Sequence, residues 1–188
     1  MSKIRDDIEH LHQYGIYIPT KTILITGEVN EEMYERVMSN LHILDSTTGE
    51  ITIKLKSEGG DVVDGRAIYD AIKNCKNAVR CIVYGECSSA ASFILQAADT
   101  RIMTNNSFLM LHVGEEGHTI NHPRNIERWH EFYRYLETWS EDVYLARIKE
   151  KKKRFTRNQL KSMLQWDKII KPKEALELGL IDSIGEIQ

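Results

Sequence analysis

A serine at the start of a short helix and a histidine further along the chain could together perform nucleophilic chemistry. The serine, Ser89, lies between an apolar run at 79–83 and an apolar helical segment at 90–97. This pattern predicts a strand, a tight turn near Gly85 and a helix, with the Ser89 hydroxyl held by the backbone. The first N–H groups of a helix have no partner within it and carry the positive end of its dipole. An oxyanion beside Ser89 would therefore be stabilised, which suits acyl transfer to a serine.

Ser89 and the histidine, His112, each have an ordinary structural interpretation as well. Serine often caps a helix in a closely packed turn, and glycine four residues before serine is a loose pattern. A histidine after a short apolar segment can be a polar edge residue or a hydrogen-bonded filler. The case for catalysis therefore depends on whether the fold brings the two side chains together.

The segments that would position these residues alternate between strands and helices. The pattern predicts strands at 22–26, 51–55, 79–83, 101–104, 108–111 and 180–184, and helices near 4–11, after Asn30, and at 62–74, 90–97 and 174–178. The crossovers are long enough for parallel pairing, and right-handed crossovers bring the ends of consecutive strands to one edge of the sheet. Gly59-Gly60, Ser89 and His112 each follow a predicted strand, so we expect them to converge at that edge, where α/β proteins place their sites.

A long helix is predicted at 121–153. Its apolar residues recur at helical spacing: Ile126, Trp129, Phe132, Tyr133, Leu136, Trp139, Val143 and Tyr144. A helix this long and this aromatic on one side suits packing against another subunit, and an ordinary core helix would give the same spacing.

Composition narrows the classes of function. The 188 residues are 41% hydrophobic and 28% charged, which favours one domain in a globular protein. The net charge of -3 argues against nucleic acid or a membrane surface as partner, and the basic run at 149–154 suits a solvated helix end. No apolar run approaches the length of a membrane span. An odd cysteine count without an apolar leader predicts reduced thiols and a cytoplasmic protein.

Neither a metal nor a cofactor is predicted. His118 and His122 have a spacing that could bind a metal on a helix. However, Gly117 and Pro123 oppose a helix through both histidines, and the sequence offers no evident third ligand.

Four motifs in order resemble the Clp protease proteolytic subunit, over residues 18–184. They are Gly59-Gly60 after a strand, the serine turn, the Met-Leu-His run that ends at His112, and residues 174–182. The resemblance implies the ClpP/crotonase fold, an α/β repeated ββα spiral with a long projecting helix. It implies one domain over 1–188, in which 1–18 is an N-terminal segment and 121–153 is a projecting oligomerisation helix. It also implies a serine endopeptidase that cleaves polypeptides inside homo-oligomeric stacked rings, usually heptamers, fed by an ATPase unfoldase.

The resemblance also implies roles for individual residues. Ser89 matches the nucleophile and His112 the general base, while the backbone N–H groups of Gly60 and Ala90 match the oxyanion hole. The positions that match the two edges clamping an extended peptide are Gly59, Asp61, Val62, Val113 and Gly114. In the implied mechanism Ser89 attacks the scissile carbonyl, and His112 takes its proton and passes it to the leaving amine.

The third member of the triad is left open by the sequence. Counting back from Gly179 places the family's acidic position on Met163, which cannot accept a hydrogen bond from the histidine ring. Asp167, one helical turn later, is the nearest acid. Three alternatives follow: Asp167 replaces the missing acid through a shifted backbone, the site is a Ser-His dyad whose ring is oriented by a carbonyl or an asparagine, or the site is weakened or inactive.

Other functions are compatible with these motifs. Met163 motivates a non-catalytic or weakly active ring subunit, and a viral capsid-maturation peptidase of the same fold would share the chemistry. A crotonase-type acyl-CoA enzyme would share the two oxyanion donors, but no pair of carboxylates is placed for proton abstraction. The serine endopeptidase is the interpretation that uses Ser89, His112 and the double glycine together.

Overall fold

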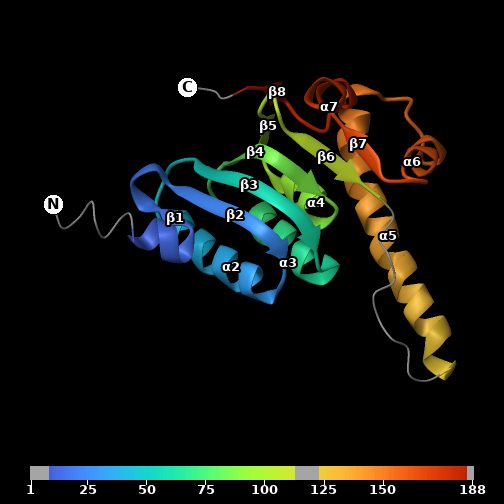
Figure 1. Ribbon diagram of the computed structural model, residues 1–188, viewed down its shortest axis with the longest axis horizontal. Helices are drawn as coiled ribbons and strands as arrows, with labels where there is room; N and C mark the ends of the chain where they lie inside the picture. The colour runs from blue at the N-terminus through green and yellow to red at the C-terminus, as the bar shows by residue number, and fades with distance from the viewer. Residues whose placement is uncertain (1–8, 113–122, 186–188) are drawn as a thin grey trace.

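The computed structural model describes residues 9–112 and 123–185, which form a mainly parallel sheet flanked by helices (Figure 1). Residues 9–14 are helical. The elements that follow are β1 (Ile16–Tyr17), the 3-10 helix η1 (Ile18–Thr20), β2 (Thr22–Val29), α2 (Glu31–Asp45), β3 (Ile51–Gly60), α3 (Val62–Lys73), β4 (Val79–Ser88), α4 (Ala90–Ala97), β5 (Thr100–Met103), β6 (Phe108–Leu111), α5 (Pro123–Lys151), α6 (Arg157–Met163), β7 (Lys168–Ile170), α7 (Pro172–Leu178) and β8 (Ser183–Ile184).

The sheet divides at strand β4. Its main path runs β1-β2-β3-β4-β5-β8, and the strands β2 to β5 are parallel. The first part of β4 pairs with β5, whereas its last residues, up to Ser88, pair with β6. Between these parts lies Gly85, whose φ of 67° is a conformation that glycine adopts without steric cost. The predicted strand end near Gly85 was therefore wrong, because the glycine bends the strand instead of ending it.

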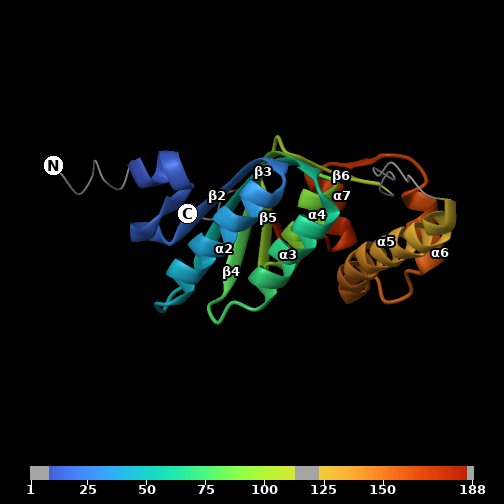
Figure 2. The ribbon, with the colours of Figure 1, turned by 90° about the horizontal axis from the view of Figure 1, so that it is seen from below.

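Helices α2, α3 and α4 lie together on one face of the sheet (Figure 2). Helix α2 buries the predicted stripe of Met33, Val37, Leu41 and Leu44. Its first turn is capped by Asn30, whose side-chain oxygen accepts a hydrogen bond from the Met33 N–H at 3.0 Å, as the sequence predicts. The apolar periodicity thus identified the core-facing side of this layer correctly.

Helix α5 is buried along one half, as a core helix would be, and exposed along the other half, as a helix that packs against another subunit would be. Residues in its second half are buried, and these include Val143, Tyr144 and Ile148. Ile126, Trp129 and Phe132 in its first half are exposed, and the helix extends away from the sheet in Figure 1. The described part of the helix runs from Pro123 to Lys151, so the helix ends two residues before the predicted end at 153, and residues 121 and 122 lie outside the described residues.

The C-terminal segment departs most from the sequence prediction. Strand β7 was not predicted, because three residues are too few to show a period. The last strand, expected over 180–184, is limited to Ser183–Ile184. The segment is tied to β5 by Asp182, whose carboxylate accepts hydrogen bonds from the Arg101 guanidinium at 2.7 and 3.0 Å and from the Arg101 backbone N–H at 2.8 Å. Burial raises the pKa of Asp182, but its bonds to Arg101 and the nearby positive charge outweigh this and lower the pKa below its ordinary value.

Replacing Asp182 with asparagine is expected to lower the free energy of unfolding at pH 7 by about 2 kcal/mol, because Arg101 is almost fully buried and loses the nearer of its two acidic partners, keeping only Glu150 at 3.9 Å. The difference from the wild type should shrink in acid. A carboxylate with a lowered pKa contributes stability above its unfolded pKa of about 4, and that stability is lost as the pH falls through the folded pKa. Urea unfolding of both proteins between neutral and acidic pH measures this. A difference that stays constant across that range would contradict the assignment.

Candidate active site

Ser89 is the single residue between strand β4 and helix α4, and its backbone is strained. Its φ of 51° and ψ of -123° lie outside the regions that L-residues favour. Such a conformation costs on the order of 1–3 kcal/mol and persists only where the surroundings enforce it. The backbone N–H of Ser89 donates to the carbonyl of Met110 at 2.8 Å, which fixes the turn to β6. The Ser89 side chain makes no capping hydrogen bond, so the helix-cap interpretation was wrong.

His112 directly follows β6 and lies in contact with Ser89. Strand β6 pairs in parallel with the end of β4, with Ser88 opposite Met110, so residues just beyond both strands meet. The Nε2 atom of His112 is 2.7 Å from the Oγ of Ser89. This distance lies within the range required between a nucleophile and its base. The expected meeting of Ser89 and His112 at the sheet edge is therefore present.

Asp167 reaches the other side of the histidine ring through strand β7. This strand pairs antiparallel with β6, with Leu111 opposite Lys168, so His112 and Asp167 each lie one residue beyond this last pair, on neighbouring strands. The Nδ1 atom of His112 and the Oδ1 atom of Asp167 are 3.7 Å apart, and the Asp167 side chain is 72% exposed. Met163 instead ends helix α6 and packs against the core. The carboxylate beside the histidine is therefore that of Asp167.

Gly59 and Gly60 lie within strand β3, not after it, and both require the absence of a side chain. A Cβ on Gly59 would lie 2.6 Å from the Cβ of Ser89 and 3.0 Å from the backbone nitrogen of Ala90. A Cβ on Gly60 would lie 2.2 Å from the carbonyl oxygen of Val29. The first glycine thus lets strand β3 approach the turn that holds Ser89. Ala90 begins helix α4, so its N–H has no partner within the helix.

Substituting Gly59 with alanine is expected to impair both stability and the Ser89 site. The residue has a φ of 95°, and its new methyl group would overlap the Cβ of Ser89 and the carbonyl oxygen of Ser88, which is backbone and cannot swing away. We expect the free energy of unfolding to fall by more than about 1 kcal/mol and reaction with a serine-directed phosphonate to slow. Gly27 is the matched control, since it has a similar φ of 88° and open space around its Cβ position. Equal labelling rates in the Gly59→Ala and Gly27→Ala proteins would exclude a steric effect on Ser89.

Of the predicted peptide-clamping positions, Gly59, Asp61 and Val62 lie among the described residues. Asp61 caps helix α3, with its carboxylate accepting from the N–H groups of Val63 and Asp64, and its own N–H donates to Val29 at 2.7 Å. Val62 is the first residue of α3. Asp61 and Val62 therefore lie at the start of helix α3, directly after Gly59 and Gly60. Val113 and Gly114 lie outside the described residues.

Cys87, two residues before Ser89, is a buried and unreactive thiol. Burial raises the pKa of Cys87 well above its ordinary value, so the thiol stays protonated near neutral pH. Since the thiolate is the nucleophilic form, Cys87 does not compete with Ser89. The role predicted for it, a small buried apolar residue, fits this environment.

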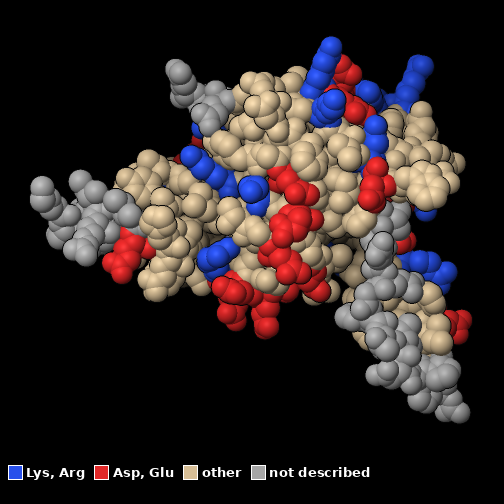
Figure 3. All heavy atoms as spheres, viewed as in Figure 1, with Lys and Arg blue, Asp and Glu red and all other residues tan. Residues whose placement is uncertain are grey.

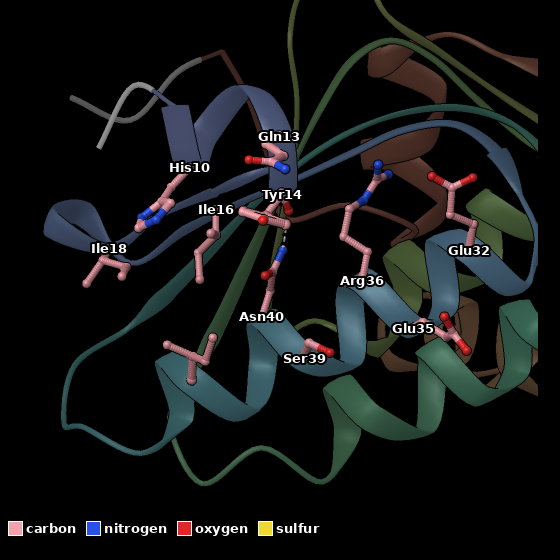
Figure 4. Close-up of a pocket in the computed structure, with 11 residues that line it drawn as sticks. His10, Gln13, Tyr14, Ile16, Ile18, Glu32, Glu35, Arg36, Ser39 and Asn40 are labelled. Carbon is pink, nitrogen blue, oxygen red and sulfur yellow. Dashed lines mark hydrogen bonds between the residues drawn. The ribbon is translucent and has the colours of Figure 1, made fainter. Parts of the chain in front are cut away.

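The pocket with the best-defined lining in the described part of the chain lies away from Ser89. A pocket of about 700 Å³ lies between residues 10–18 and helix α2, and in Figure 4 the Asn40 side chain donates to the Tyr14 carbonyl at 2.7 Å. Its lining does not include Ser89, His112 or Asp167. On the face seen in Figure 3, acidic side chains gather near the lower centre and basic ones are scattered, so this face has no continuous basic surface for nucleic acid.

Metal ligands and membrane-spanning segments were searched for in the described part of the chain. In residues 9–112 and 123–185, no group of three or more histidine, cysteine or acidic side chains is arranged to hold a metal ion. His118 and His122, the pair considered from the sequence, lie outside these ranges. None of the helices within these ranges has the length and hydropathy needed to cross a membrane.

Ser89 lies at a strained strand-to-helix turn, His112 is in contact with it, and a carboxylate lies beyond the histidine. Serine hydrolases are recognised by this arrangement of side chains. The chain belongs to the Clp protease family, whose sequence profile matches residues 6–188. It is therefore a peptidase, one class of hydrolases.

Individual relatives agree with this assignment. The ATP-dependent Clp protease proteolytic subunit of Deinococcus radiodurans is 30% identical over 178 residues, which cover 91% of this chain and 84% of the relative. Proteolytic subunit 2 of Treponema denticola is 37% identical over 100 residues, covering 51% and 50%. The chloroplastic subunit 3 of Arabidopsis thaliana is 26% identical over 182 residues, covering 94% and 56%.

A solved structure supports the fold. A point mutant of ClpP1 from Listeria monocytogenes superposes with a TM-score of 0.79 at 28% identity, covering 91% of this chain and 94% of that one. The fold class expected from the sequence is confirmed.

Proposed function

We propose that this protein is a serine endopeptidase in which Ser89 is the nucleophile, His112 the general base and Asp167 the orienting carboxylate. The observation that carries the proposal is the 2.7 Å contact between the Ser89 Oγ and the His112 Nε2. The carboxylate of Asp167 favours a proton on Nδ1, which leaves Nε2 as the acceptor for the serine proton. Each of the three groups then has a role that its position permits.

The reaction proceeds through two tetrahedral intermediates. Ser89 Oγ attacks the scissile carbonyl while its proton moves to His112 Nε2, and the oxyanion is held by the N–H groups of Gly60 and Ala90. The C–N bond then breaks as His112 protonates the leaving amine. Water, deprotonated by His112, attacks the acyl-enzyme, and the proton returns to the Ser89 oxygen as the carboxylic acid leaves. The cycle uses only the chain's residues and water.

Substrates and assembly follow from the family and from helix α5. We infer that the substrates are polypeptides, supplied by an ATPase unfoldase to a chamber of homo-oligomeric stacked rings. The exposed apolar side chains on the first half of α5, among them Trp129 and Phe132, support an interface between subunits. The three cysteines are unpaired, which supports a reducing cytoplasmic location.

Intact mass after incubation with a fluorophosphonate tests the central claim. We expect one covalent adduct per chain, mapped by peptide sequencing to Ser89, together with hydrolysis of a short fluorogenic peptide. Native mass measurement on the same sample reports the assembly. No adduct on a well-formed oligomer would contradict the serine peptidase, whereas an adduct on a monomer would contradict only the ring.

A further inference from the structure

Two buried hydroxyl groups connect the backbone of Ser89 to helix α5. Ser92, one turn into α4, has no exposed surface, and Tyr144 of α5 is 3% exposed. The Oη atom of Tyr144 lies 2.6 Å from the Oγ of Ser92, and that Oγ lies 2.6 Å from the carbonyl oxygen of Ser89. A continuous hydrogen-bonded chain therefore runs from the long helix to the residue at the strained turn.

The direction of this chain follows from counting protons. A carbonyl oxygen only accepts, so the single hydroxyl hydrogen of Ser92 is donated to Ser89. Tyr144 must then donate to the Ser92 oxygen. Burial raises the pKa of Tyr144, so its phenol stays protonated near neutral pH and can donate this hydrogen bond.

The Ser89 carbonyl oxygen accepts two hydrogen bonds that can hold the strained backbone of Ser89 in place. It accepts from the Ser92 N–H at 2.9 Å as well as from the Ser92 hydroxyl. The first bond belongs to the turn of α4 and would form with any residue other than proline at position 92. The second depends on the hydroxyl, and it fixes the peptide plane that follows Ser89. That plane includes the N–H of Ala90, one of the proposed oxyanion donors.

Helix α5 also holds the far end of α4. One turn after Tyr144, the guanidinium of Arg147 donates to the carbonyl oxygens of Gln96 at 2.6 Å and Ala98 at 3.0 Å. Residues three apart on a helix share a face, so Tyr144 and Arg147 contact the two ends of α4 from the same side of α5. Helix α5 thus contacts α4 at both ends, and the Tyr144 contact lies at the end next to Ser89.

We propose that Tyr144 and Ser92 are positioning residues for Ser89, acting through the Ser89 carbonyl to keep its hydroxyl in line with His112 and the Ala90 N–H aimed at the oxyanion. This inference rests on the proposed serine peptidase function and assigns a part of its machinery to helix α5. Neither residue touches the substrate, so their effect is expected on kcat rather than on KM.

Kinetics of three variants test the proposal: Ser92→Ala, Tyr144→Phe and the double variant. We expect Ser92→Ala to lower kcat and the fluorophosphonate labelling rate about tenfold, and Tyr144→Phe about threefold, with KM and the shape of the pH profile unchanged. Tyr69→Phe is the matched control. It removes a phenol oxygen from α3, from a ring that packs edge-on against Trp139 of α5, the helix that carries Tyr144. That variant should keep wild-type kcat.

Thermal stability separates positioning from simple packing. Ser92→Ala leaves the buried Tyr144 hydroxyl without an acceptor and should lower Tm, whereas the double variant removes that orphan group and should recover part of the loss. Activity should not recover with it, because the Ser89 carbonyl still lacks its second donor. A kcat that rises and falls with Tm across the set would overturn the proposal, as would unchanged kcat in Ser92→Ala.

Crystal structures of the wild type and the double variant decide the question without turnover. The proposal expects the Ser89 φ and ψ, or the distance from its Oγ to the His112 Nε2, to change in the double variant. Unchanged geometry would overturn it. If the wild type shows no serine-dependent hydrolysis, the proposed function fails, while these structures still decide whether Tyr144 and Ser92 position Ser89.

Discussion

Replacing Ser89 with alanine is expected to abolish peptide hydrolysis, lowering kcat by a factor on the order of 10⁶. The variant loses the atom that forms the acyl bond in the proposed mechanism and that lies 2.7 Å from the His112 Nε2. Because the members of a triad act as a unit, His112 and Asp167 have little to activate once the nucleophile is gone. Turnover of a fluorogenic peptide measures the loss of catalysis, and the disappearance of the fluorophosphonate adduct measures the loss of the nucleophile.

The neighbouring serine provides a matched control for this substitution. The Ser88 hydroxyl donates to the Glu86 carboxylate at 2.7 Å, away from the histidine. Ser88→Ala should therefore keep both the adduct and the turnover. Peptide hydrolysis that survives in a purified, correctly assembled Ser89→Ala protein would show that another group is the nucleophile.

The sequence predicted the parts of the fold that depend on periodicity. The stripe of Met33, Val37 and Leu41 identified α2 and its buried face, because a helix that covers a sheet must turn its apolar residues toward it. The helix after Ser89 was predictable for a similar reason, since small residues after an apolar run mark a junction between strand and helix, although the strand itself continues to Ser88. Periodicity also predicted the long helix, but not how much of it would be buried.

The bend of β4 could not be predicted from local pattern. Gly85 looks like the end of a strand, because glycine commonly marks turns. Its function in the fold is visible only with both partners of β4 in place, one strand pairing before the bend and the other after it. The same limitation applies to Gly59, whose lack of a side chain is required by Ser89, a residue far away in the sequence.

The position of Asp167 shows why counting along a chain can misplace a site residue. Counting back from Gly179 drew attention to Met163, but the distance that matters runs across the sheet from His112. That distance is set by the antiparallel register of β6 and β7, and β7 has only three residues. The sequence offered Asp167 as one alternative. Only the pairing of β6 with β7 shows that its carboxylate lies next to the histidine ring.

Replacing Asp167 with asparagine is expected to lower kcat by about 10²- to 10⁴-fold while KM changes little. Asparagine keeps the shape of the side chain but cannot stabilise the imidazolium that forms when His112 takes the serine proton. It can also favour the unproductive tautomer, with the proton on Nε2. The Asp167 carboxylate is exposed and lies 3.7 Å from Nδ1, so solvent weakens its interaction with the imidazolium. We therefore expect a loss toward the lower end of this range. Pre-steady-state acylation with a peptide ester measures the affected step directly.

An acid introduced at position 163 separates the two candidate positions for the carboxylate. Met163 packs against the core at the end of α6, so Met163→Asp should lower stability and add no turnover to the wild type. Combined with Asp167→Asn, it should not restore kcat, because the pairing of β6 with β7 brings residue 167, not residue 163, beside the His112 ring. Restoration in the double variant would place the functional carboxylate in α6. Unchanged turnover in Asp167→Asn alone would remove Asp167 from the mechanism and favour a Ser-His dyad.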